Sequence, residues 1–269
     1  MKARVRLLAP SGNGPTLLFV HGGPSAASKW APLVERLPDF RCLLLERPGC
    51  GLSELPRAGP RRVRAYVAQM VDDALTALDS EPAAIVASSF GSFCVLAAAL
   101  ARRDRMPRLV HMGCPALAPG VATPLSSVLP ALPGAGAVVR ALQPPSFERS
   151  RRSFEGMGHA PSVLRSAELT AFLDWYTALM RHTDTRANDS RLFGRVRPRD
   201  ALSMLELSDL DVPMSFFWGE DDSFGEAAVG EGIVEALPSA SLEILAGGGH
   251  LPWLDAPDRA ADHVRSAVA

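Results

Sequence analysis

Short runs of apolar residues alternate with longer helical patterns along much of this 269-residue chain, and this alternation limits the possible folds most strongly. Strands that read as nearly continuous apolar runs are typical of a parallel sheet with helices on both faces. The first half predicts strands at Leu17–Val20, Cys42–Leu45, Ala84–Ala87 and Leu109–Met112, and helices at Trp30–Leu37, Val63–Leu78 and Phe93–Ala101. The predicted fold class is therefore α/β, with a mostly parallel sheet flanked by helices.

The same pattern returns near the C-terminus. Met214–Trp218 and Leu242–Leu245 predict two more strands, and Ile233–Leu237 continues the apolar pattern between them. A last helix begins at Pro257, where the missing N–H of proline is tolerated. Both ends of the chain are therefore expected to belong to one sheet.

The stretch between these ends has a different character. It opens with proline-, glycine- and alanine-rich sequence, and it contains no buried strand pattern. Its clearest element is the amphipathic helix Ala167–Met180, whose apolar residues recur at helical spacing. We predict a core made of residues 1–115 and 206–269, with a helical cap inserted as residues 116–205.

Composition excludes several classes of function. A net charge of -1 and a pI near 6.6 give no general attraction to nucleic acid or to a membrane surface, so we expect neither as a partner. The four cysteines are scattered, which predicts neither a metal site nor a redox motif, and we expect no cofactor. No apolar run approaches the ~20 residues of a membrane helix or resembles a signal peptide, so we expect a soluble cytoplasmic protein. The oligomeric state stays open.

Ser89 is the candidate nucleophile. It follows the predicted strand Ala84–Ala87 and precedes a helix, within the segment Ala87-Ser88-Ser89-Phe90-Gly91. In a nucleophile elbow, a tight strand-to-helix turn holds the serine in a strained conformation, and small residues two positions away on either side let the backbones pass. A serine before a helix can also be an ordinary N-cap, so the interpretation depends on partners elsewhere in the chain.

A glycine turn supplies the first of these partners. His21-Gly22-Gly23-Pro24 follows the strand Leu17–Val20 directly. Backbone N–H groups at such a turn can point at developing negative charge, and the N–H of Phe90 would be the second donor. Gly23 and Phe90 are therefore the predicted oxyanion hole, and His21 is interpreted as a structural histidine of the turn.

The last two strands are followed by a candidate base and its carboxylate. His250 ends the glycine run after Leu242–Leu245, and Glu220, Asp221 and Asp222 come just after Met214–Trp218. A carboxylate at the neighbouring strand end can accept the Nδ1–H of the histidine while Nε2 faces the serine. The spacing leaves all three carboxylates as candidates.

Five segments together carry a resemblance to a known family: His21-Gly22-Gly23-Pro24, Glu46-Arg47-Pro48-Gly49-Cys50-Gly51-Leu52-Ser53, the serine elbow, Trp218-Gly219-Glu220-Asp221-Asp222 and Gly249-His250. They resemble the α/β-hydrolase superfamily of serine hydrolases with a helical cap, over about residues 15 to 115 and 205 to 269. The resemblance implies a triad of Ser89, Asp222 and His250, because the family's acid lies three residues after the glycine of the strand-end motif.

A serine at position 89 predicts a reaction through an acyl-enzyme. The expected substrates are small to medium esters, thioesters or lactones. C–C bond hydrolysis of the meta-cleavage type is an alternative, as is aminopeptidase action, and a different class is a non-catalytic ligand-binding member of the fold. Trp175 and Tyr176, on the helix Ala167–Met180, are candidate walls of the substrate pocket.

Overall fold

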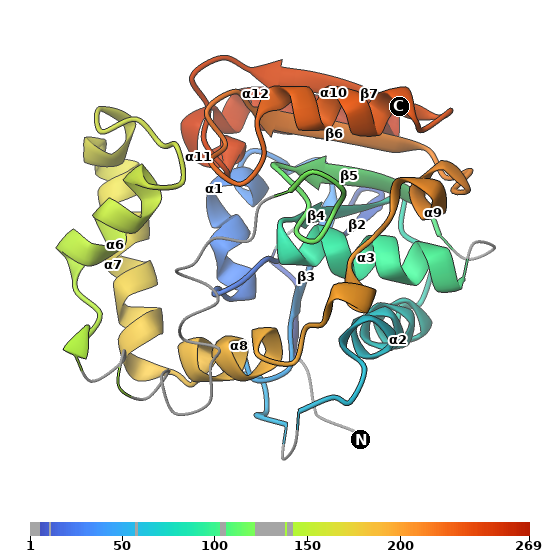
Figure 1. The fold of residues 1–269 in the computed structure, drawn as a ribbon. Helices are drawn as coiled ribbons and strands as arrows, with labels where there is room; N and C mark the ends of the chain where they lie inside the picture. The colour runs from blue at the N-terminus through green and yellow to red at the C-terminus, as the bar shows by residue number, and fades with distance from the viewer. Residues whose placement is uncertain (1–5, 11, 57–58, 103–105, 122–137, 139–141) are drawn as a thin grey trace.

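A seven-stranded sheet forms the centre of the computed structural model, which describes residues 6–10, 12–56, 59–102, 106–121, 138 and 142–269 (Figure 1). The strand order is β1-β3-β2-β4-β5-β6-β7, and among these strands only β1 runs antiparallel to its neighbour. The strands are β1 (Arg6–Leu8), β2 (Thr16–Val20), β3 (Arg41–Glu46), β4 (Ala84–Ser88), β5 (Arg108–Met112), β6 (Met214–Gly219) and β7 (Ala240–Leu245). The predicted fold class is confirmed.

The register of the sheet brings the ends of its parallel strands to one edge. Val20 of β2 pairs with Ala87 of β4, and Ser88 pairs with Met112 of β5. Farther along, Gly219 at the end of β6 pairs with Leu245 at the end of β7. The loops that carry the predicted site residues therefore all leave the sheet at the same edge, which is where open α/β sheets bind ligands.

Helices bury both faces of the sheet in separate cores. Leu18 and Val20 of β2 point into a core with α2 and α3, whereas Leu17 and Phe19 point into a core with α1, α11 and α12. This alternation follows from the two-residue period of a strand. The helices of these layers are α1 (Ala31–Val34), α2 (Val63–Thr76), α3 (Phe90–Ala101), α10 (Ala227–Glu235), α11 (Pro252–Asp255) and α12 (Pro257–Val268).

Three local details differ from the sequence-based expectation. The helix predicted at Trp30–Leu37 is a 3₁₀ turn, η1 (Ala27–Trp30), followed by the short α1, in which Pro32 lies in the first turn. Helix α3 begins at Phe90, directly after Ser89, and so earlier than expected. Strand β1 was not predicted, because three largely exposed residues show no apolar run.

The described part of the segment between β5 and β6 contains helices and no strand. The predicted helix Ala167–Met180 is present as α7 (Ala167–His182), and the side chain of Ser166 accepts a hydrogen bond from Leu169 N–H at its start. Figure 1 shows α6 and α7 side by side, with α8 leading back from the foot of α7. The other elements are α6 (Phe147–Glu155), η4 (Val163–Arg165), α8 (Thr185–Phe193), η5 (Pro198–Asp200) and α9 (Met204–Ser208). The limits of the predicted cap stay a prediction.

All four cysteines are buried and reduced. Burial raises the pKa of the Cys42 and Cys94 thiols to about 12, and it also raises those of Cys50 and Cys114. They lie in four different places: β3, the loop after β3, α3 and the loop after β5. Within the described residues, no helix combines the length and the apolar character needed to cross a bilayer.

Candidate active site

Ser89 lies in the turn between β4 and α3 with a backbone conformation that is rare for a residue with a side chain. Its φ is 52° and its ψ is -120°. The turn is tightly enclosed: a Cβ on Gly91 would lie 2.1 Å from the carbonyl oxygen of Val20, and a Cβ on Gly22 would lie 2.9 Å from Cβ of Ser89. Strain of this kind persists where the surrounding structure imposes it, and it clusters at functional sites.

Asp222 and His250 form a buried pair at the same edge of the sheet. His250 Nδ1 lies 2.8 Å from Oδ2 and 3.0 Å from Oδ1 of Asp222. The carboxylate also accepts hydrogen bonds from the N–H groups of Cys114 and Phe224, each at 3.0 Å. These contacts require Nδ1 to carry a proton, which leaves Nε2 of His250 as the basic nitrogen.

Of the three candidate carboxylates, only that of Asp222 contacts the histidine. Asp221 is exposed, and Glu220 instead accepts a hydrogen bond from the N–H of Gly247 at 3.0 Å. The ring of Phe224 packs against the ring of His250, with ring centroids 4.2 Å apart. The position of Phe224, two residues after Asp222, was not singled out in the sequence.

The loop after β5 connects Ser89 with the Asp222–His250 pair. Ala116 N–H donates to the carbonyl of Ser89 at 3.1 Å, and a Cβ on Gly113 would lie 2.1 Å from the carbonyl oxygen of His250. No hydrogen bond joins Ser89 Oγ or His250 Nε2 to a described residue. Catalytic hydrogen bonds often tighten only when substrate is bound, so this geometry is compatible with a triad.

The glycine turn after β2 lies against the serine. His21 Nε2 accepts the backbone N–H of Arg47 at 3.1 Å, and its Nδ1 lies 2.7 Å from the carbonyl oxygen of Gly22. Burial, reinforced by the charge of Arg47, holds the pKa of His21 well below its usual value, so this histidine is neutral and donates through Nδ1. Both ring nitrogens are thus occupied in holding the turn. The N–H groups of Gly23 and Phe90 have no acceptor among the described residues, and both remain available to a ligand.

A buried lysine lies beneath the elbow. The Lys29 ammonium is 3.4 Å from Ser88 Oγ and lies over the rings of Trp30 and Trp253, 5.9 and 5.1 Å from their centroids. Its burial, reinforced by the charge of Arg47, lowers the pKa of Lys29 to about 7. Lys29 was not singled out in the sequence, although Lys2 and Lys29 are the only lysines of the chain among 28 basic residues.

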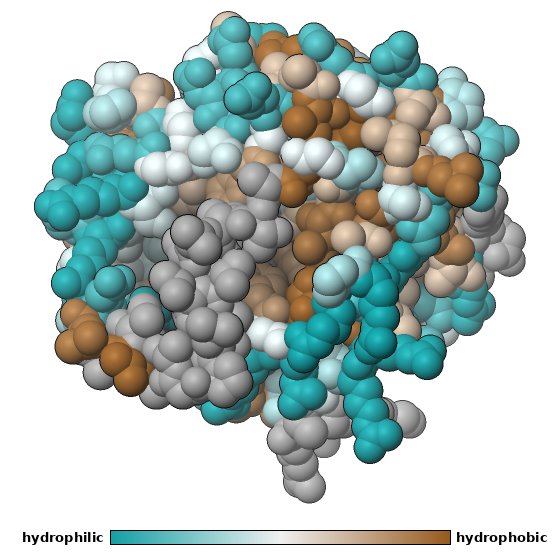
Figure 2. Space-filling model, viewed as in Figure 1, coloured by the Kyte–Doolittle hydropathy of each residue, from teal (hydrophilic) through white to brown (hydrophobic). Residues whose placement is uncertain are grey.

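The predicted pocket residues Trp175 and Tyr176 are half-buried on α7. The ring of Tyr176 packs edge-on against Phe154, 5.1 Å between centroids, and both predicted residues pack against a small cluster of Ala26, Leu179 and Met180. In the space-filling view, this face of the molecule is hollowed, and hydrophobic residues border the hollow (Figure 2). Among the described residues no hydrogen bond joins α7 to Ser89, and a role of Trp175 and Tyr176 in the pocket stays a prediction.

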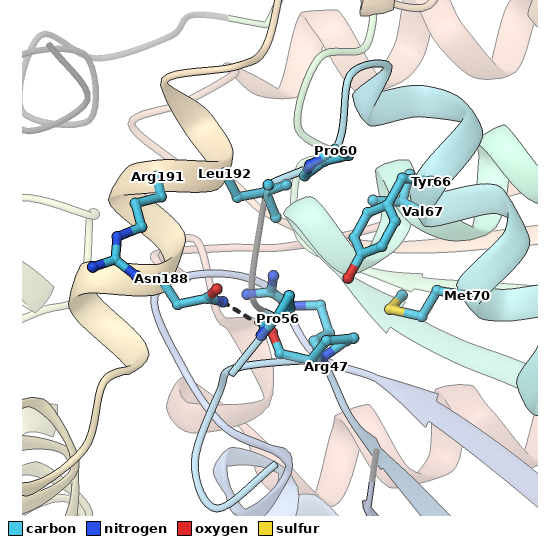
Figure 3. A pocket seen from close by; sticks show the side chains of 11 residues that line it. Arg47, Pro56, Pro60, Tyr66, Val67, Met70, Asn188, Arg191 and Leu192 are labelled. Carbon is cyan, nitrogen blue, oxygen red and sulfur yellow. Dashed lines mark hydrogen bonds between the residues drawn. The ribbon is translucent and has the colours of Figure 1, made fainter. Parts of the chain in front are cut away.

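A small cavity lies beside Arg47, between the loop after β3, α2 and α8 (Figure 3). Its volume of about 40 Å³ holds a few water molecules, which is too small for an acyl substrate. None of Ser89, Asp222 and His250 lines it. In the described part of the chain, no three His, Cys, Asp or Glu side chains gather as metal ligands would.

The other histidines are packed or exposed rather than placed at the elbow. His159 pairs with Asp255 at 2.9 Å, and His263 lies 2.9 Å from Glu243. His182 is exposed at the end of α7. His111 is fully buried against Phe216 without a partner on either ring nitrogen, and burial lowers its pKa to about 3.

Comparison with known proteins places the chain among hydrolases. Residues 15–257 match the model of a family described as the alpha/beta hydrolase fold. A 2-hydroxy-6-oxononadienedioate/2-hydroxy-6-oxononatrienedioate hydrolase of Cupriavidus pinatubonensis is 27% identical over 247 residues, covering 87% of this chain and 80% of the relative.

Two solved structures have the same fold over nearly the whole chain. The 2-hydroxy-6-oxo-6-phenylhexa-2,4-dienoate hydrolase of Rhodococcus sp. RHA1 superposes with a TM-score of 0.80 at 18% identity, covering 99% of this chain and 95% of that one. A carboxylesterase of Bacillus subtilis superposes with a TM-score of 0.78 at 19% identity, covering 99% and 88%.

Proposed function

Because this chain belongs to the α/β-hydrolase family, we propose that it is a serine hydrolase that cleaves small to medium esters, thioesters or lactones through an acyl-enzyme. The observation that carries the proposal is the strained backbone of Ser89, at the strand edge where the buried Asp222–His250 pair also lies. A serine in this conformation presents its hydroxyl to a substrate, on the side of the sheet that also carries the proposed base. The intact pair argues against the non-catalytic alternative.

The proposed reaction follows from the protonation of His250. Ser89 Oγ attacks the substrate carbonyl and passes its proton to His250 Nε2, while Asp222 stabilises the imidazolium through Nδ1–H. The N–H groups of Gly23 and Phe90 stabilise the oxyanion of the tetrahedral intermediate. The intermediate collapses, His250 protonates the leaving group, and water then attacks the acyl-enzyme with His250 again acting as base.

We also propose that residues 116–205 form a cap over this edge and select the substrate. Support comes from the helices of the described part of this segment and from the cluster in which Leu179 and Met180 of α7 meet Ala26, with Trp175 and Tyr176 packed against it. The proposed triad and Gly23 lie on loops that follow strands, and Phe90 is the first residue of α3, so none of these residues belongs to the proposed cap.

A second candidate reaction is C–C bond hydrolysis of a ring-fission product. Its support is that the Cupriavidus relative and the Rhodococcus protein are both named as hydrolases of such dienoates. The same three catalytic residues would serve. A screen of p-nitrophenyl esters of increasing chain length, beside a chromogenic ring-fission dienoate, distinguishes the two reactions by which substrate gives the higher kcat/KM.

The proposed nucleophile is tested by Ser89→Ala, with Ser88→Ala as the matched control. We expect Ser89→Ala to lower kcat on the order of a million-fold with the fold unchanged, whereas Ser88→Ala stays active. A fluorophosphonate probe should label Ser89, as read by mass spectrometry. Loss of activity in Ser88→Ala with activity retained in Ser89→Ala would show that the elbow has another register.

A further inference from the structure

A buried ion pair joins α8 to the loop after β3, directly behind the glycine turn. Arg47 NH2 lies 2.8 Å from Oδ2 of Asp189, and each side chain is only 2% exposed. The same guanidinium nitrogen donates to the carbonyl oxygen of Gly22 at 2.9 Å. Although burial opposes the charge, Asp189 raises the pKa of Arg47, so the guanidinium is fully charged. Asp189 thus acts on the glycine turn through one shared donor.

The Gly22 carbonyl sets the direction of the N–H of Gly23. It accepts two hydrogen bonds, one from Arg47 and one from the neutral His21. The Gly22–Gly23 peptide is trans, so its N–H points opposite to its C=O. Two donors on the carbonyl also polarise the peptide and strengthen its N–H as a donor. The charge pair therefore controls both the direction and the strength of a proposed oxyanion donor.

The pair also lies in contact with the backbone of the turn. A Cβ on Gly23 would lie 2.6 Å from Oδ2 of Asp189 and 3.0 Å from NH2 of Arg47. Only glycine leaves room for the ion pair at this point. A displacement of Asp189 or Arg47 therefore shifts the turn itself.

Further contacts fix α8 on the same region. Asn188 Nδ2 donates to the carbonyl of Pro48 at 2.9 Å, and Thr185 Oγ1 accepts the N–H of Gly51 at 2.8 Å (Figure 3 shows Asn188). Phe193, at the end of α8, packs edge-on against the ring of Phe90, 5.0 Å between centroids. Helix α8 thus contacts both residues whose N–H groups we propose as oxyanion donors.

We propose that Asp189 and Arg47 are positioning residues of the oxyanion hole, through which α8 holds the Gly22–Gly23 peptide in the orientation that transition-state binding requires. The inference rests on the proposed serine-hydrolase function. A buried ion pair contributes little net stability, because desolvation offsets the attraction, whereas its directional bonds fix a geometry.

The test compares catalysis with binding in Asp189→Asn. The amide keeps the shape of the side chain and removes the charge that holds Arg47. On an activated ester we expect kcat to fall about 10- to 100-fold, which is less than the complete loss of an oxyanion donor, and KM to change by less than about threefold. A trifluoromethyl ketone, which forms a tetrahedral oxyanion adduct with the serine, should bind more weakly by the same factor. The carboxylic acid product should bind as to the wild type.

A double variant separates positioning from the cost of an unpaired charge. Arg47→Met combined with Asp189→Leu removes both charges with side chains of similar size, and such replacements often leave stability unchanged or improved. We expect it to fold with the wild-type Tm and to remain as slow as Asp189→Asn, because the Gly22 carbonyl has lost the hydrogen bond from Arg47 and keeps only the one from His21. Restored kcat in the double variant would overturn the proposal.

Asp184→Asn is the matched control, since it makes the same substitution at an exposed position just before α8. It should leave kcat and ketone binding unchanged. Wild-type kcat in a folded Asp189→Asn would also overturn the positioning role while leaving the proposed function intact. Failure of a fluorophosphonate to label Ser89 in the wild type would reject the proposed function itself, and this role with it.

Discussion

Replacing Lys29 by methionine is expected to stabilise the protein, and to do so less as the pH rises. Lys29 is only 4% exposed, and the one hydrogen bond that its ammonium makes to a described residue, with Ser88 Oγ, is long at 3.4 Å. Burial lowers the pKa of this lysine from 10.5 to about 7. Methionine has a similar length and fits between Trp30 and Trp253 without a charge.

The two pKa values of Lys29 set the size of the effect. Between pH 7 and 10.5 the unfolded chain holds a proton that the folded protein has lost, so the wild type gains stability as the pH rises through this range. At about 1.4 kcal/mol per pKa unit, the lowered pKa of Lys29 reduces the free energy of unfolding of the wild type by about 4 kcal/mol at pH 7 and by about 2 kcal/mol at pH 9. The lost contacts with Ser88 and the two rings offset on the order of 1–2 kcal/mol. We therefore expect Lys29→Met to gain about 2–3 kcal/mol at pH 7 and almost nothing near pH 10.

Urea unfolding followed by tryptophan fluorescence measures this difference, with wild type and variant compared at pH 6.5, 8 and 9.5. Arg191→Met, at an exposed position on α8, is the control and should show a small difference that is independent of pH. A gain from Lys29→Met that is equal at pH 6.5 and 9.5 would refute the reasoning. So would a variant less stable than the wild type at pH 6.5, because the ammonium would then be stabilised by the rings.

Asp222→Asn should leave a folded protein with kcat lowered by roughly four orders of magnitude, because the amide favours the wrong histidine tautomer, while Asp221→Asn should be far milder; equal losses would contradict the assignment of Asp222. Trp175→Ala and Tyr176→Ala, made singly, should shift the chain-length optimum of kcat/KM across esters from acetate to decanoate, whereas a uniform loss at every length with unchanged thermal stability would mean that these rings do not line the acyl site. Burial lowers the pKa of His111 from 6.5 to about 3, so stability is lost as the pH falls below about 6.5, at about 1.4 kcal/mol per unit. His111→Phe should therefore raise the Tm more at pH 5 than at pH 8, and equal gains at the two pH values would exclude His111 as the titrating group.

The central strands could be predicted from the sequence because they are buried on both faces. Runs such as Leu17–Val20 and Ala84–Ala87 are apolar without interruption, and each lies within one residue of the observed strand at either end. Strand β1 escaped prediction because it is held by pairing with β3 rather than by burial of its own side chains. Pairing partners that are distant in the chain leave no local pattern.

In the candidate site, too, residues that follow a strand could be predicted, whereas contacts between distant segments could not. The strand-end positions of Ser89, Asp222 and His250 were readable because each follows a recognisable strand. The ion pair of Arg47 and Asp189 was not, since the two residues are 142 positions apart and meet only when α8 docks on the sheet. None of the triad or oxyanion residues was assigned to the segment 116–205 from the sequence. The contacts of α8 with the glycine turn join part of that segment to the proposed oxyanion hole.

The buried cysteines allow local opening of the protein to be measured by their reactivity. A thiol whose pKa is raised and whose sulfur is covered reacts with a disulfide reagent only in molecules that have opened at that point. Cys50 touches Asn188 and Asp189, whereas Cys94 lies in the middle of α3. The rate at which Cys50 reacts, relative to Cys94, therefore measures how often α8 lifts from the sheet while the rest of the molecule stays closed. A bound ligand that clamps α8 would slow the first rate and leave the second unchanged.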